Sequence, residues 1–144
     1  MNETLRDISA TITWYRKLPR DFNDINLLMN ARRSLSTMLY EVAGMLAEYA
    51  RDKIAAEHVR KAFEAEKFAE LRDKAEKPIT SQIEASVKAL SVAYCQREAD
   101  TEAEYQAARI VYDAAKNVCD VMNQHIANLK SEKRDEMIGV GSQY

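Results

Sequence analysis

Apolar residues recur every three or four positions along most of the chain, and this spacing predicts three helices. The first is expected over about residues 3 to 18. Asn2 or Thr4 is placed to cap its beginning, and Pro19 closes it. Its apolar stripe consists of Leu5, Ile8, Ile12 and Tyr15.

A much longer helix is expected over about residues 25 to 76, after a short connector in which Asn23 or Asp24 acts as the cap. Gly44 is its only internal breaker, and one helix absorbs a glycine at a cost of ~1 kcal/mol. Beyond Arg51 the apolar stripe thins and charges of both signs take over. Before that point the stripe is dense and consists of Leu28, Leu35, Met38, Leu39, Val42, Met45, Leu46 and Tyr49.

The chain is expected to turn back over residues 77 to 81. Pro78 lacks a backbone N–H and disfavours the α conformation at Lys77, so the preceding helix ends there. Ser81 and Glu84 have the spacing of a capping box, which predicts that their side chains cap the next helix. A stop and a restart so close together predict a helical hairpin.

The third helix is expected over about residues 82 to 135, with a loose tail over 136 to 144. Its C-terminal part has the heptad spacing of a coiled coil, carried by Tyr105, Ala108, Tyr112, Ala115, Cys119, Met122, Ile126 and Leu129. In a hairpin centred near residue 79, position i pairs with roughly 158 minus i, because both helices rise equally per residue. This pairing places Ile126 near Arg32.

The same pairing places an acidic stretch of the third helix beside basic residues of the second. The acidic residues are Glu98, Asp100, Glu102 and Glu104, and the basic ones are Lys53, Arg60 and Lys61. Such ion pairs set the register while adding little stability. The sequence therefore predicts an all-α fold. One domain over residues 1 to 144 forms a long antiparallel, coiled-coil-like helical hairpin with a shorter N-terminal helix.

The composition agrees with long helices, because the 144 residues include only 3 glycines and 2 prolines. The 2 cysteines lie far apart on one predicted helix and cannot pair within the chain, which favours a reducing compartment. The first residues show no signal-peptide pattern, and no apolar run reaches the ~18 residues that span a bilayer. We therefore expect a soluble cytoplasmic protein with no membrane partner.

Several apolar residues lie off the interface between the two long helices. Among them are Leu27, Ile54, Phe68, Val111, Val118 and Val121. A helix of ~50 residues is ~75 Å long, so the short first helix covers only part of it. Because burial of these residues takes another subunit, we expect a homo-oligomer.

Basic and aromatic residues alternate around the end of the first helix, from Trp14 to Phe22. Sites for single-stranded nucleic acids combine cations for phosphates with aromatic rings for bases. Because the net charge is −2, a polyanion can bind only where cations collect. The alternative is that Trp14 and Phe22 pack the first helix onto the hairpin while the cations are merely solvated. The expected site, at the open end of the hairpin, consists of Trp14, Arg16, Lys17, Arg20, Arg32, Arg33, Lys130, Lys133 and Arg134.

Catalytic and metal chemistry find little support in the sequence. His58 and His125 lack the Glu-x-x-His spacing of four-helix di-iron sites, because Ala55 and Met122 stand three residues before them. There is no Gly-rich phosphate loop, which argues against an ATP-driven activity. We expect no enzyme activity, no cofactor and no metal.

Three stretches of the chain have counterparts in a known family. They are Tyr49-Ala50, the turn Lys77-Pro78-Ile79-Thr80 with the following Ile83-Glu84-Ala85-Ser86-Val87, and the run Ile126-Ala127-Asn128-Leu129-Lys130-Ser131-Glu132. With them the chain resembles small helical proteins of tailed phages, the T-even-type recombination mediator and its short relatives.

The resemblance implies an oligomeric, non-enzymatic accessory factor of DNA recombination in the host cytoplasm. Such a factor binds single-stranded DNA and helps to load a recombinase onto strands covered by single-strand-binding protein. The alternative function is a protein-only coiled-coil adaptor, such as a phage-encoded inhibitor or a structural scaffold.

Overall fold

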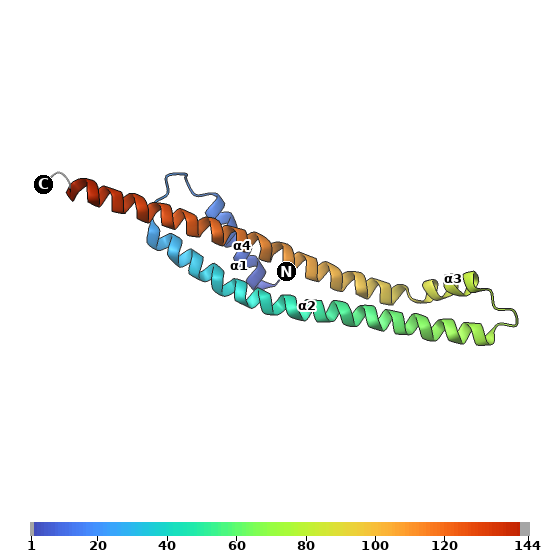
Figure 1. The fold of residues 1–144 in the computed structure, drawn as a ribbon. Helices are drawn as coiled ribbons and strands as arrows, with labels where there is room; N and C mark the ends of the chain where they lie inside the picture. The colour runs from blue at the N-terminus through green and yellow to red at the C-terminus, as the bar shows by residue number, and fades with distance from the viewer. Residues whose placement is uncertain (1, 142–144) are drawn as a thin grey trace. The chain divides into compact units, whose positions relative to one another are not determined.

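A computed structural model describes residues 2–141, which form four α-helices (Figure 1). They are α1 (Glu3–Arg16), α2 (Ile25–Lys74), α3 (Thr80–Leu90) and α4 (Val92–Gly141). The described residues contain no strand. The all-α prediction is therefore confirmed.

The first helix begins as predicted and ends slightly early. The Asn2 side chain accepts a hydrogen bond from the backbone N–H of Thr4 over 2.7 Å, so Asn2 is the N-cap. α1 ends at Arg16 because the backbone N–H of Lys17 bonds to carbonyls of the preceding turn and tightens it. The apolar stripe is confirmed for Leu5, Ile8 and Ile12, which are buried, whereas Tyr15 is partly buried.

The second helix is also close to its prediction. The Asp24 side chain accepts a hydrogen bond from the backbone N–H of Leu27 over 3.0 Å, so Asp24 provides the cap. α2 passes through Gly44 without interruption and ends at Lys74. One glycine in a helix of 50 residues is therefore absorbed, as expected.

The capping box predicted at Ser81 and Glu84 is wrong. α3 begins at Thr80 and its N-cap is Ile79, which is extended (φ −109°, ψ 111°) and makes no side-chain capping bond. A capping box needs a non-helical residue at its first position, whereas Ser81 already lies inside the first helical turn. The restart therefore relies on backbone hydrogen bonds to the carbonyl of Ile79.

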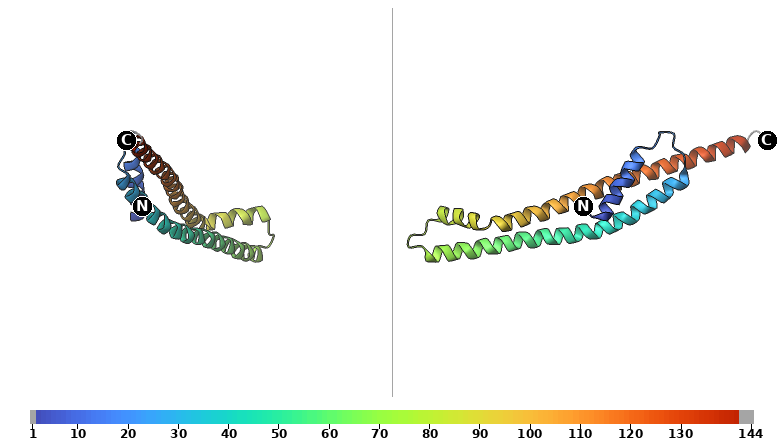
Figure 2. Two further views of the ribbon diagram at one scale, coloured as in Figure 1. Left: turned by 60° about the vertical axis from the view of Figure 1, so that its left-hand side comes forward. Right: turned by 180° about the vertical axis from the view of Figure 1, so that it is seen from behind.

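The single helix predicted over residues 82 to 135 is divided at Ser91. The backbone N–H of Ser91 bonds to the carbonyl of Val87 (3.0 Å), and its buried hydroxyl donates to the carbonyl of Lys88 (3.2 Å). A serine that bonds back to the preceding turn bends a helix. Figure 2 shows the change of direction between α3 and α4 at this point.

The loose tail predicted over residues 136 to 144 is wrong for its first part, because α4 continues to Gly141. The glycine at 139 costs ~1 kcal/mol of helix propensity, and this penalty does not end the helix. Residues 142–144 of the predicted tail lie outside the described residues.

The chain forms two compact units, and α2 and α4 contribute to both. Unit 1 comprises Met1–Gly44 with Ala108–Tyr144. In it α1 lies against α2 and α4 (Figure 1). The Thr4 hydroxyl donates to the Glu41 carboxylate over 3.2 Å and ties α1 to α2. The apolar core of unit 1 includes Leu5, Ile8, Leu28, Leu35, Val42, Ala115, Cys119, Met122 and Ile126.

Unit 2 comprises Met45–Ala107 and has a thinner core. Its buried residues are Ala56, Ile83, Val87, Ser91 and Thr101. The Phe63 and Tyr94 rings stack with centroids 4.2 Å apart and join α2 to α4. The thinning predicted beyond residue 51 is therefore confirmed. The single domain predicted over residues 1 to 144 stays a prediction.

The helices pair in antiparallel order within each unit. In unit 2, Lys53 pairs with Glu102 (2.7 Å) and Arg60 pairs with Glu98, as the charge pattern predicted. In unit 1 the Arg32 guanidinium donates to the Asn123 side chain over 2.9 Å, one helical turn before the expected neighbour Ile126. The ion pair between Arg60 and Glu98 keeps the register expected for a hairpin centred near residue 79, so the shift of one turn is confined to pairs further from the turn.

Among the apolar residues expected off the interface of the two long helices, Val118 is buried within the single chain, so the expectation that its burial takes another subunit is wrong. Val118 shares a helix face with His125, seven residues further on, and His125 contacts Tyr15 of α1. The face is therefore covered by α1. Leu27, Ile54 and Val121 are exposed, as expected. The homo-oligomer stays a prediction.

Candidate nucleic-acid interface

All nine residues predicted for nucleic-acid binding belong to unit 1. Trp14 and Arg32 are partly buried. The other seven side chains are exposed, and we refer to them as the unit 1 cations: Arg16, Lys17, Arg20, Arg33, Lys130, Lys133 and Arg134. They come from the end of α1, the connector over residues 17–24, α2 and α4.

His125 of α4 holds the end of α1 and the connector in place. Its Nε2 lies 3.1 Å from the carbonyl oxygen of Phe22, and its Nδ1 lies 3.2 Å from the hydroxyl of Tyr15. A carbonyl only accepts, so Nε2 donates to Phe22, and in a neutral imidazole Nδ1 then accepts from the Tyr15 hydroxyl. Burial raises the pKa of the Tyr15 phenol, which keeps it a donor.

Sequence reasoning missed this role, because it considered His125 as a possible metal ligand. Its partners Tyr15 and Phe22 lie 110 and 103 residues away, so no local spacing indicates the contact. The one available signal was its place next to Ile126 on the heptad stripe.

The connector also meets α4 one to two turns further along. A hollow of about 260 Å³ is lined by Asn23, Ile25 and Lys133, among others. The connector that carries Arg20 therefore lies between His125 and Lys133 of α4. Arg32 is held differently, because Asn123 binds its guanidinium.

Trp14 is partly buried, and its ring meets that of Phe22 edge to face, with centroids 6.3 Å apart. This is the aromatic packing of the alternative interpretation, in which Trp14 and Phe22 hold α1 in place. Edge-to-face pairs stabilise a fold by about 0.5–1.5 kcal/mol beyond the area they bury. Trp14 therefore has a structural role whatever else it binds.

The two units differ in how their cations are paired. Unit 1 has 11 basic and 10 acidic residues, a net charge of +1, whereas unit 2 has 10 basic and 13 acidic residues, a net charge of −3. In unit 2, carboxylates pair with Lys53, Arg60, Lys61, Lys67, Arg72 and Lys74. Within residues 2–141, no ion pair holds any of the unit 1 cations.

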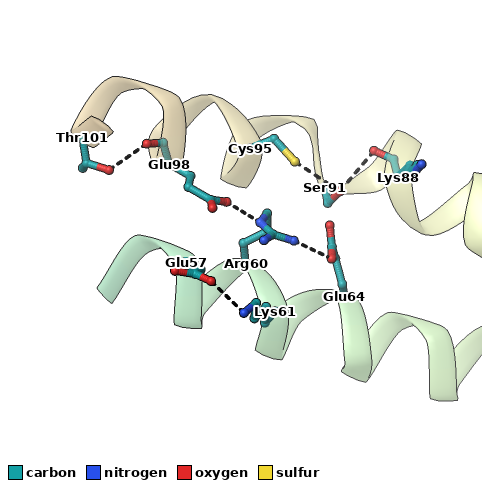
Figure 3. Close-up of polar contacts among 9 residues, drawn as sticks. All are labelled: Glu57, Arg60, Lys61, Glu64, Lys88, Ser91, Cys95, Glu98 and Thr101. Carbon is teal, nitrogen blue, oxygen red and sulfur yellow. Dashed lines mark hydrogen bonds and ion pairs between the residues drawn. The ribbon is translucent and has the colours of Figure 1, made fainter. Parts of the chain in front are cut away.

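Figure 3 shows two of the ion-paired cations of unit 2, Arg60 and Lys61. The Arg60 guanidinium lies between Glu98 of α4 and Glu64 of α2, and the Lys61 ammonium binds Glu57 over 2.7 Å. The hydrogen bond to Glu98 raises the pKa of Arg60. These cations are already neutralised. Four other unit 2 cations, Arg51, Lys77, Lys88 and Arg97, are exposed and in no ion pair within the described residues, but they lie in the unit with a net charge of −3.

Other chemistry is sparse in the part of the chain that the structure describes. No group of three or more His, Cys, Asp or Glu side chains is arranged there to hold a metal ion. No helix in residues 2–141 is long and apolar enough to cross a membrane. Cys95 is exposed, whereas burial raises the pKa of the Cys119 thiol.

No protein-family model, curated protein or solved structure shows a significant match to this chain. The resemblance to phage recombination mediators therefore stays a prediction, and a functional proposal has to rest on the geometry of unit 1.

Proposed function

We propose that this protein is a non-enzymatic, oligomeric accessory factor of DNA recombination that binds single-stranded DNA through the unit 1 cations. The observation that carries the proposal is that unit 1, with a net charge of +1, collects seven exposed cations without ion pairs, whereas unit 2 has a net charge of −3 and six of its ten cations are ion-paired. A recombinase and a single-strand-binding protein are the partners that the family resemblance adds, in the host cytoplasm.

Unpaired cations are what a polyanion needs. Each phosphate that a cation neutralises releases counterions and steepens the salt dependence of single-strand binding by roughly 0.7 in the log-log slope. An ion-paired lysine gains less, because the phosphate must displace its carboxylate. Since the whole chain carries a net charge of −2, binding by one subunit is weak and strongly dependent on salt.

Assembly compensates for weak single sites. Unit 1 exposes large apolar side chains, among them Tyr40 (84% exposed) and Ile110 (67% exposed), which support contact between subunits. Several linked sites on one strand then bind far more tightly than one site does. The proposal therefore includes a homo-oligomer.

The test is a fluorescence-anisotropy titration with single-stranded and duplex oligonucleotides at two salt concentrations. We expect Lys17→Glu/Arg33→Glu to weaken single-strand binding and to lower the salt slope by about 1.4, which is two contacts at roughly 0.7 each. The matched control is Lys88→Glu/Arg97→Glu in unit 2, where both side chains are also exposed. This control variant makes the same change in net charge, and it should leave the salt slope of single-strand binding unchanged.

Two results contradict the proposal. One is the absence of single-strand binding at low salt. The other is an equal loss of affinity in the two double variants, since that would reflect net charge rather than a site.

A second candidate function is a protein-only adaptor. It is favoured by exposed apolar residues around the α3–α4 junction in unit 2, including Leu90 and Val92. If single-stranded DNA is not bound, we expect the chain to assemble as its concentration rises, and Val92→Glu to abolish this assembly. Analytical sedimentation measures both. An unchanged assembly would contradict the adaptor as well.

A further inference from the structure

A groove between α1 and α2 lies beside Trp14 in unit 1. It has a volume of about 410 Å³. The lining residues that matter here are Thr11 and Trp14 from α1, with Leu27, Asn30, Ala31 and Ser34 from α2. The volume is at the lower end of the range for small-molecule sites, about 300–1,000 Å³, which suits one small planar group.

Each helix contributes both apolar and polar side chains to the lining of the groove. Trp14 and Leu27 provide the apolar part, and Leu27 is 44% exposed although its helix neighbour Leu28 is fully buried. Asn30 and Ser34 provide an amide and a hydroxyl. Within the described residues, no hydrogen bond uses either side chain. An aromatic face beside free donors and acceptors is the combination that recognises a nucleobase.

Cations flank the groove on both helices. Lys17 follows Trp14 by three residues on α1 and its capping turn, and Arg33 follows Asn30 by three residues on α2. Side chains three residues apart are neighbours on a helix surface. Both cations are exposed and belong to the unit 1 cations. A base in the groove thus has positive charge within reach of the phosphates on either side of it.

We infer that this groove is a pocket for a single unstacked base of the bound DNA strand. The inference rests on the proposed function and makes it more specific. The base lies against Trp14 and its edge bonds to Asn30 and Ser34, while Lys17 and Arg33 bind the flanking phosphates. A duplex keeps its bases stacked and paired, so the pocket predicts a preference for single strands that cations alone would not provide.

Trp14 is the only tryptophan of the chain, so its fluorescence reports on this groove directly. The experiment uses the full chain and two thymidine oligonucleotides of equal length, one natural and one in which abasic sites replace alternate nucleosides. Both carry the same phosphates. Affinity is measured by anisotropy at low salt, and Trp14 emission is recorded over the same titration.

We expect the natural strand to quench Trp14 and the abasic strand to bind roughly 5- to 150-fold more weakly, the range for loss of base–aromatic stacking. Asn30→Leu fills the groove without changing any charge, and it should reduce binding of the natural strand to the abasic level. The matched control is Asn26→Leu. Asn26 is an exposed asparagine on the same helix that does not line the groove, so this change should have no effect.

The outcomes separate the two proposals. If both strands bind equally and Trp14 emission does not change, the base pocket is wrong and phosphate binding by the unit 1 cations still stands. If Asn30→Leu and Asn26→Leu behave alike, the base pocket is also wrong. If neither strand binds at low salt, both proposals are wrong.

Discussion

Removal of the His125 side chain tests whether α4 holds the end of α1 and the connector. In His125→Ala the Tyr15 hydroxyl loses its acceptor at 3.2 Å and the carbonyl of Phe22 loses its donor at 3.1 Å. The contact between the Tyr15 and His125 rings, whose centroids lie 6.1 Å apart, is lost as well. All of these contacts lie in unit 1.

The expected loss of stability follows from the two hydrogen bonds. Each contributes about 0.5–1.5 kcal/mol net, so His125→Ala should lower the free energy of unfolding by roughly 1–3 kcal/mol. A chain of this length shifts its melting temperature by about 4 °C per kcal/mol, which predicts a decrease of roughly 4–12 °C. Tyr15→Phe removes only one of the bonds and should cost about half as much.

Denaturant titration followed by Trp14 fluorescence is the assay, because this single tryptophan lies in unit 1 next to Phe22. His58→Ala is the matched control. His58 is exposed and makes no hydrogen bond within the described residues, so its removal should change stability by less than about 0.5 kcal/mol. In a double-mutant cycle, Tyr15 and His125 should show a coupling energy of about 0.5–1.5 kcal/mol.

The reasoning is refuted if His125→Ala is no more destabilising than His58→Ala. A coupling energy near zero between Tyr15 and His125 would refute the hydrogen bond in particular. His125→Ala should also weaken binding of single-stranded DNA although it removes no cation, because the connector that carries Arg20 is no longer fixed.

Three further predictions concern other parts of the chain. Cys95 should react within seconds to minutes with an excess of a thiol reagent in the native protein, whereas Cys119, which is buried with a raised pKa, should react only on unfolding; equal rates would contradict this. Gly44→Ala should stabilise the protein by up to ~1 kcal/mol, because nothing lies within 4 Å of the added Cβ and alanine favours the helix; thermal unfolding checks this. Hydrogen bonds from two lysines lower the pKa of Glu70 from 4.5 to about 2, so its contribution to stability is present above pH 4.5 and is lost as the pH falls toward 2. Wild type should therefore lose more stability than Glu70→Gln between pH 5 and pH 3 in denaturant titrations, and equal losses would rule out the pairing.

Periodicity and capping residues were enough to predict the first two helices, because both signals are local. The stripe of α1 and the caps at Asn2 and Asp24 depend on residues within one or two turns. The charge pattern also predicted that Lys53 and Arg60 pair with α4, since the hairpin pairing follows from helix rise alone. Likewise, the cations around the end of α1 could be named from a local excess of positive charge, whereas those of α4 follow from the hairpin pairing.

Only the tertiary structure decided features that depend on contacts across the chain. The bend at Ser91 follows from a buried hydroxyl that bonds to its own preceding turn, although serine in an exposed helix carries no such signal. The role of His125 depends on partners more than 100 residues away. The groove beside Trp14 exists because α1 packs at one side of α2, and helical periodicity specifies which residues face a neighbour without specifying where that neighbour lies.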